Sequence, residues 1–134
     1  MKNQESENVR VDIGGKAIDI LDFSKQFAAM STKQDPERDY LGRYVALIVR
    51  AIMEYVFCNP DIPAENRSFD FVNKLLQNTH SAKEWEMIFY REDKQIPGAK
   101  AYTKFLAAPV PADHIRAVVA LRWNSCVRAI WSRM

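Results

Sequence analysis

One stretch of the chain, from Asp35 to Phe57, predicts a buried central helix, because from Tyr44 onward it is apolar on nearly every side of a helical wheel. Within it, residues 44–57 carry only two charged side chains, Arg50 and Glu54. These two are four residues apart, so they can pair along one narrow strip of the helix surface. A helix that is apolar almost all round has neighbours on several sides. We therefore expect the other elements of the fold to pack around this segment.

The start of this segment is typical of a helix in a globular protein. Asp35 is a suitable N-cap, and Pro36 fits the first helical position because its φ is already helical. The alternative is a membrane-spanning helix, which needs about 20 predominantly apolar residues. The apolar run here is shorter and is interrupted by Arg50 and Glu54, so the sequence predicts no membrane span.

Composition limits the chain to one domain of moderate charge. With 134 residues, 48% of them hydrophobic and 27% charged, it has the composition of an ordinary soluble globular domain. The formal net charge is only +2, whereas a protein that holds nucleic acid through its overall field is usually more basic. No apolar segment follows Lys2, so no signal peptide is visible and we expect a cytoplasmic protein.

The N-terminal part predicts a polar tail followed by a short β-hairpin. Residues 1–8 are polar and aperiodic, so we expect a disordered tail. In the following VRVDIGGKAIDI, apolar and polar residues alternate on both sides of Gly14 and Gly15, and a Gly-Gly pair supplies the positive φ that tight hairpin turns require. An extended arm is the alternative. The same glycines with Lys16 do not make a phosphate-binding loop, because a correctly spaced first glycine and a Ser or Thr after the lysine are absent.

Apolar positions at helical spacing predict further helices on both sides of the central one. The first follows the hairpin, with Asp22 or Ser24 as its N-cap; a later one begins at the N-cap Ser68, and the next at a capping box formed by Ser81 and Glu84. The expected bounds are 21–30, 68–77, 81–91, 99–107 and 112–133. The predicted fold class is therefore mainly α: a single bundle-like domain of five to six helices over residues 9–134, with the hairpin or arm at its start.

The last expected helix has a continuous apolar face and should lie alongside the central helix, since both are long and strongly apolar. The face is formed by Ile115, Val119, Trp123, Cys126, Ile130 and Met134.

No catalytic or metal-binding pattern is recognisable. His80 and His114 lie in different inter-helix regions, with no carboxylate or cysteine at metal-ligand spacing, and a metal site needs about three or four converging ligands. Cys58 and Cys126 each lie beside an apolar residue, Phe57 and Val127, which predicts buried reduced thiols, with one disulfide as the alternative. Walker-type and Gly-x-Ser-x-Gly motifs are absent. We expect no enzyme activity, no cofactor and no metal, with an unrecognised small helical enzyme as a third alternative.

The basic residues of the last two helices are the candidate nucleic-acid contacts. Arg116, Arg122 and Arg128 are six residues apart, which turns a helix by roughly 240° per step and spreads them around it. That spread argues against a helix that reads a DNA groove with one side. Lys100 and Lys104 on the preceding helix could form one modest basic patch with Arg122. The alternative is a set of scattered surface arginines whose stems pack over apolar neighbours.

The order of the apolar segments resembles that of a known helical domain. A long apolar helix, YVALIVRAIMEYVF, is followed by a Pro-rich turn and the shorter SFDFVNKLLQ; then come IPGAKAYTKFLAAP and a final HIRAVVALRWNSCVRAIW. This pattern, over about residues 35–131, resembles the all-alpha domain of type IV secretion coupling ATPases. The pattern also resembles, as a second possibility, the comparable helical insertion of the related type IV secretion ATPases.

The resemblance implies a domain that binds rather than catalyses. Such a domain sits at the cytoplasmic mouth of a secretion motor, at the inner face of the membrane. There it engages protein substrates, relaxosome proteins or DNA. This chain lacks ATP-binding motifs, so the resemblance implies an excised domain, with the parent motor as partner, or a standalone relative. It assigns no residue-level site. The alternative function is a standalone small regulatory or inhibitory binding protein of a mobile element, a phage or a plasmid.

Overall fold

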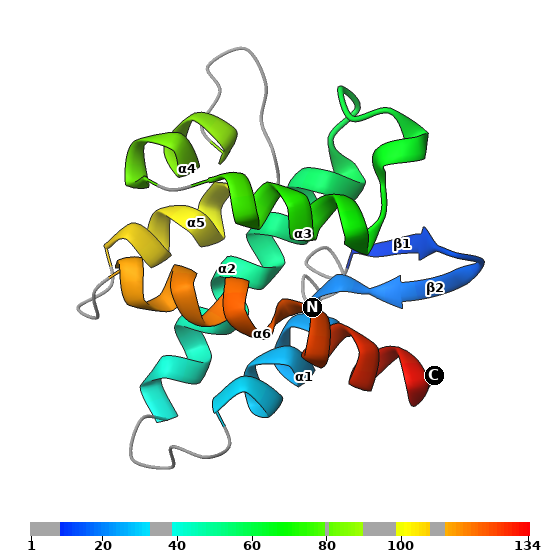
Figure 1. Ribbon diagram of the computed structural model, residues 1–134, viewed down its shortest axis with the longest axis horizontal. Coiled ribbons are helices and arrows are strands. Elements are labelled where there is room, and N and C mark those ends of the chain that lie inside the picture. Colours follow the sequence, from blue (N-terminus) through cyan, green and yellow to red (C-terminus); the bar gives the residue numbers. More distant parts are fainter. Residues whose placement is uncertain (1–8, 33–38, 80, 90–98, 108–111) are drawn as a thin grey trace, which may run out of the picture.

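The computed structural model describes residues 9–32, 39–79, 81–89, 99–107 and 112–134. These residues form a mainly helical fold of six α-helices with an N-terminal two-stranded hairpin, as the sequence predicts (Figure 1). In chain order the elements are β1 (Arg10–Ile13), β2 (Lys16–Asp19), α1 (Ile20–Thr32), α2 (Asp39–Cys58), the short 3-10 helix η3 (Ala64–Asn66), α3 (Phe69–Asn78), α4 (Ala82–Phe89), α5 (Ala99–Leu106) and α6 (Ala112–Ser132).

The hairpin has the tight turn that its glycines predict. β1 and β2 pair antiparallel, with Ile13 opposite Lys16, and the two residues between them are Gly14 and Gly15. Their φ angles are 60° and 84°, a left-handed conformation that glycine adopts without a steric penalty. The Gly15 N–H also donates to the Asp12 carboxylate at 3.0 Å. The chain therefore forms the hairpin and not the extended arm.

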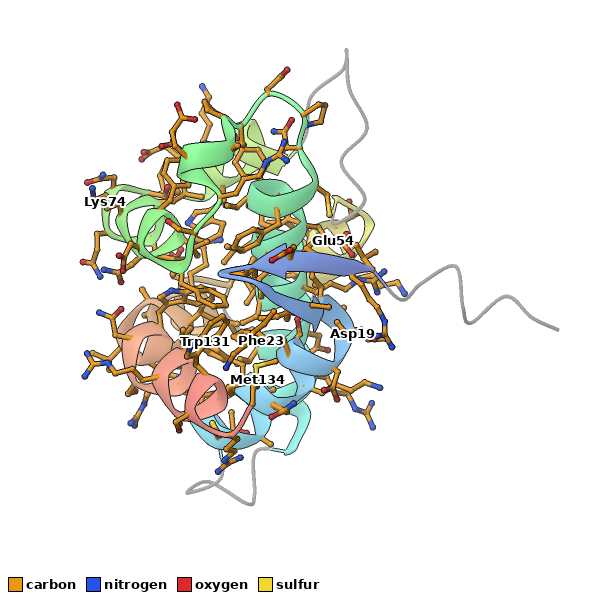
Figure 2. The ribbon with its side chains drawn as sticks, turned by 90° about the vertical axis from the view of Figure 1, so that its right-hand side faces the viewer. Asp19, Phe23, Glu54, Lys74, Trp131 and Met134 are labelled. Carbon is orange, nitrogen blue, oxygen red and sulfur yellow. The ribbon has the colours of Figure 1, made fainter. Side chains whose placement is uncertain are left out.

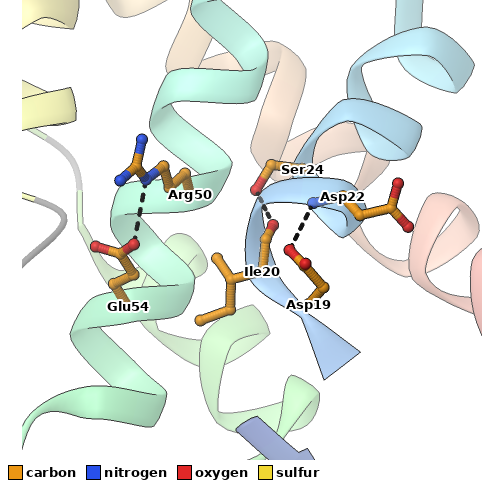
Figure 3. A network of polar contacts seen from close by, with 6 residues as sticks. All are labelled: Asp19, Ile20, Asp22, Ser24, Arg50 and Glu54. Carbon is orange, nitrogen blue, oxygen red and sulfur yellow. Dashed lines mark hydrogen bonds and ion pairs between the residues drawn. The ribbon is translucent and has the colours of Figure 1, made fainter. Parts of the chain in front are cut away.

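The first helix begins earlier than predicted, because the last residue of β2 serves as its cap. Asp19 accepts a hydrogen bond from the N–H of Asp22 at 3.1 Å, which satisfies one of the free donors of the first turn (Figure 3). Ser24 lies inside the helix and donates its hydroxyl hydrogen to the Ile20 carbonyl at 2.8 Å. The prediction of Asp22 or Ser24 as the N-cap is therefore wrong.

Helix α2 is the centre of the fold, as predicted. It contacts α1, α3, α4, α5 and α6 (Figure 1). Its buried apolar residues point in several directions, and Val45, Ile48, Val49, Ala51, Ile52, Met53 and Val56 are all fully inaccessible to solvent. The predicted cap at Asp35 and Pro36 lies outside the described residues.

Helix α6 packs on both α1 and α2 and crosses in front of α2 in Figure 1. The predicted contact between the two long helices is thus present, at a crossing rather than along their lengths. Trp123 of α6 also joins this helix to α1 and α3: it is fully buried, its ring lies 5.5 Å from that of Phe27 in α1, and its indole N–H donates to the Phe69 carbonyl in α3 at 3.2 Å. The predicted apolar face is buried as far as Ile130. Met134, beyond the end of the helix, is 51% exposed, so its assignment to that face is wrong.

The helices after α2 begin where their caps predict. The N–H of Phe71 donates to Ser68 Oγ at 3.2 Å, and that of Glu84 donates to Ser81 Oγ at 3.1 Å, so both serine caps are confirmed. The Pro-rich turn before Ser68 contains η3, which the sequence analysis did not predict. The expected end of the following helix at Arg91 lies outside the described residues.

Candidate functional site

The charged pair of the central helix has one buried member, Glu54, and one partly exposed member, Arg50. Arg50 Nε donates to Glu54 Oε1 at 3.1 Å, so the predicted pairing is confirmed (Figure 3). However, the Glu54 side chain is fully buried, so the predicted position on the helix surface is wrong for it. Its second oxygen, Oε2, has no hydrogen-bond partner among the described residues. Burial raises the pKa of Glu54, and the hydrogen bond and charge of Arg50 oppose that rise.

The C-terminal end of α2 is closed by an arginine from the following turn. Arg67 Nη2 donates to the Asn59 carbonyl at 3.1 Å, a favourable position for a cation because free carbonyls gather at a helix C-terminus. Cys58 lies beside this contact. Burial raises its thiol pKa, and the Glu54 charge raises it further, while Arg67 lowers it. A raised pKa keeps a thiol protonated, and the thiolate is the reactive form, so these surroundings do not activate Cys58 as a nucleophile.

The two cysteines are free thiols, as predicted, although only one is buried. Cys126 is 5% exposed, whereas Cys58 is partly accessible, so the expectation of burial is wrong for Cys58.

Arg116 is buried, although one alternative from the sequence was that the arginines of this helix are scattered over its surface. Its side chain is only 7% exposed and pairs with Asp113, itself 86% exposed. The guanidinium carbon lies 5.9 Å from the ring centre of Trp85 and 5.8 Å from that of Phe105, within the range of cation–π attraction. A helical wheel contains the missed signal, because Arg116 lies seven residues before Trp123 and therefore on the same buried face of α6.

This arginine links α6 to α4 and α5 through an aromatic cluster. Trp85 stacks on Tyr102 with ring centres 6.3 Å apart, and Tyr102 lies 5.8 Å from Phe105. Burial raises the pKa of Tyr102 to about 12, although the charge of Arg116 opposes the rise. A phenol with such a pKa stays protonated near neutral pH, so the cluster is a structural junction between three helices.

The predicted basic patch is only partly described. Lys104 on α5 and Arg122 on α6 are both exposed to solvent. The side chain of Lys100 lies outside the described part of the structure. No described contact joins Lys104 to Arg122, so the grouping of these three residues stays a prediction.

The exposed side of α6 is the best-defined candidate surface. We call it the α6 outer face; its residues are Ala117, Leu121, Arg122, Asn124, Ser125 and Arg128, all of which are exposed. Leu121 is 80% exposed, the largest value among the exposed large hydrophobic residues of the described chain. After Asp113 the helix has no acidic residue, so every exposed charge on this face is positive.

Other kinds of site find no support in the described residues. Among them, no group of three or more His, Cys, Asp or Glu side chains could hold a metal ion. No described helix is both long enough and apolar enough to cross a membrane. His80 lies outside the described residues. His114 is exposed in the first turn of α6, so the prediction of an inter-helix position is wrong for it.

Comparison with known proteins gave no match to a family model, to a curated protein or to a solved structure.

Proposed function

We propose that this chain is a non-catalytic binding domain of a type IV secretion or conjugation coupling system. In this proposal it engages protein substrates or relaxosome proteins and contacts DNA weakly, without reading its sequence. One observation supports binding most directly: the α6 outer face carries exposed arginines and an exposed leucine, with no carboxylate on the helix after Asp113. The assignment to a secretion system is supported by the resemblance in segment order alone.

The DNA contact is expected to be weak because the chain has few exposed cations in one place. Its net charge is +2, and Arg116, one of the four arginines of the last segment, is buried. Non-specific binding through phosphate contacts gives a Kd of roughly 10⁻⁴ to 10⁻⁶ M at physiological salt. We propose Lys100, Lys104 and Arg122 as the carriers, and expect binding in this range or none detectable.

A titration of two unrelated DNA duplexes over a salt series tests the DNA contact. Replacing Lys100, Lys104 and Arg122 together by alanine should weaken binding equally on both duplexes and flatten its salt dependence, because phosphate contacts carry no sequence code. The matched control replaces Arg10, Lys25 and Arg43, exposed cations on β1, α1 and α2, and removes the same charge. Similar losses from the two triple variants would show that only net charge matters.

Two outcomes of this titration point away from the proposal in different directions. Tight binding to one duplex and not to the other would favour the alternative function, a regulatory protein of a mobile element that acts as a repressor. Absence of binding even at low salt would remove the DNA contact and leave a protein partner as the sole kind of ligand.

The link to a secretion motor has its own test, in the genetic context of the chain. A Walker-type motif in the same reading frame, or a relaxase gene beside it, would support the link. A purified motor or relaxosome protein encoded there should then bind this chain in a sedimentation assay, and absence of that binding would contradict the proposed role.

A further inference from the structure

We propose that the α6 outer face binds an acidic, amphipathic helix of a partner protein. The inference rests on the proposed binding function and names the chemistry of the partner. Three properties of the face carry it: the exposure of Leu121, the small side chains around it, and the sign of the charges beside it.

Leu121 gives the face an apolar centre. At 80% exposure nearly all of its side chain is in contact with water, while the opposite side of α6 is buried against α1 and α2. Single exposed leucines are common on protein surfaces, and this one carries no inference by itself. Its significance comes from its neighbours.

Those neighbours leave room for a second helix. Ala117 and Ser125 lie four residues before and after Leu121, so the three side chains share one stripe of the helix surface. Alanine and serine are short, so a partner helix could approach the α6 backbone closely and cover the leucine. Helices pack at about 8–10 Å between axes when the side chains at the contact allow it.

The charges beside this stripe select an acidic partner. Arg128 lies seven residues after Leu121, on the same stripe, and Arg122 lies on one flank. Neither guanidinium forms an ion pair within the described part of the chain, and Lys74 of α3 projects from the same side of the molecule as α6 (Figure 2). A second copy of this face would present the same cations and be repelled.

The leucine and the short neutral side chains favour a protein over a nucleic acid. Phosphate recognition needs cations along the contact, whereas the centre of this face is Ala117, Leu121 and Ser125. A partner helix with leucines on one stripe and glutamates beside it matches both the apolar centre and the arginines. This is the helix-on-helix mode in which apolar anchors repeat every three or four residues.

A synthetic helical peptide tests the proposal directly. The probe has about 15 residues, roughly four turns, with leucines on one stripe and flanking glutamates. Fluorescence anisotropy of the labelled peptide against the full chain should show saturable binding. Leu121→Ala should weaken it about tenfold, because that is the effect of removing a few buried methyl groups. Replacing Arg122 and Arg128 by alanine should weaken it about three- to tenfold, and less at high salt.

Matched controls separate this face from general stickiness or charge. Leu106→Ala, on α5, removes another exposed leucine, and the pair Arg10→Ala and Lys25→Ala removes two exposed cations elsewhere. Both should leave the affinity within about twofold, the range expected for surface sites away from the contact. The peptide with lysine in place of each glutamate, and the acidic peptide with serine in place of each leucine, should bind markedly more weakly.

Several results would overturn the inference without touching the proposed function. These are absence of peptide binding at low salt, equal effects of Leu121→Ala and Leu106→Ala, or tight binding of the leucine-free peptide. Duplex DNA binding that depends on Arg122 and Arg128, with no peptide binding, would assign the face to nucleic acid. The converse result is also informative: the peptide binds as expected, but no motor or relaxosome protein binds the chain. It would support the proposed helix-binding site on the α6 outer face and contradict the secretion role.

Discussion

Arg50 and Glu54 form an ion pair of 3.1 Å in which the Glu54 side chain is fully buried while the Arg50 side chain is 23% exposed. Water is therefore excluded from the carboxylate but keeps partial access to the arginine side chain. Arg50 satisfies only Glu54 Oε1, and Oε2 has no partner among the described residues. Burial of the charged form is thus the larger effect on this carboxyl group, which makes its ionisation unfavourable in the folded state.

Glu54 should make the stability of the fold depend on pH. Its pKa in the folded state is raised above the ordinary value of 4.5, so the folded state binds the proton more tightly than the unfolded state does. The stability that this proton adds to the fold is fully present below pH 4.5 and is lost as the pH rises through the raised pKa. Glu54→Gln has no such loss. The stability of the variant relative to the native chain should therefore increase with pH, measured as urea-unfolding midpoints from about pH 4 to pH 8.

The exposed Glu65 provides the control for this measurement. Glu65→Gln should leave the difference in stability nearly constant over the same pH range. A constant difference for Glu54→Gln as well would show that burial does not perturb the ionisation of Glu54.

The packing of the helical core should depend on Ile48 of α2 and Trp123 of α6. Both side chains are fully buried, so their truncation leaves cavities. We expect Ile48→Ala to lower the free energy of unfolding by about 2–5 kcal/mol and Trp123→Ala by about 3–5 kcal/mol. Chemical denaturation measures both. Leu121→Ala on the exposed side of α6 should change it by no more than about 0.5 kcal/mol. Near-neutral midpoints for the two buried sites would contradict the described crossing.

Gly15 should be required for its backbone conformation alone. Its φ is 84°, and a Cβ atom added there would meet no other atom within 4 Å. Gly15→Ala should therefore destabilise the chain by about 1–2 kcal/mol without any clash. Gly15→Asn should lose less, because asparagine tolerates the left-handed region. Thermal unfolding of the two variants checks the order, and equal losses would point to a cause other than φ.

The isolated chain should neither bind nor hydrolyse ATP. The sequence contains no Gly-rich phosphate loop followed by Lys and Ser or Thr, and Gly14-Gly15-Lys16 forms a hairpin turn instead. Isothermal titration with ATP and magnesium, and a phosphate-release assay, measure the two activities. Saturable binding with micromolar affinity would contradict the prediction.

The apolar pattern of the sequence was sufficient to predict the helices and their buried faces. Ile48, Trp123 and their neighbours recur at helical spacing, and hydrophobic burial follows that spacing. Several of the errors concern polar residues. Asp19 both ends β2 and caps α1. A prediction that assigns each residue to a single element misses such a double role. Glu54 was expected on the helix surface because it is charged, although its position on the wheel lies among buried neighbours.

The candidate surface was harder to predict than the core, for a physical reason. Exposed positions such as those of Leu121 and Ser125 tolerate many residue types, because their side chains are in water. They therefore produce no regular pattern in the sequence. Their shared exposure becomes visible only after α6 is placed on the core. The sequence analysis identified Arg122 by its charge but gave no reason to connect it with Leu121.

The contact between Phe27 and Trp123 has a consequence for how the molecule acquires its structure. One ring comes from the first helix and the other from the last, yet both close over the same central helix. Contacts between such distant parts of a chain raise the contact order and slow folding, because a long loop must close before they form. During synthesis, the side of α2 that α6 covers has no partner until almost the whole described chain has been made. Hydrogen exchange should therefore find the amides of α2 protected together, released by a single global opening rather than helix by helix.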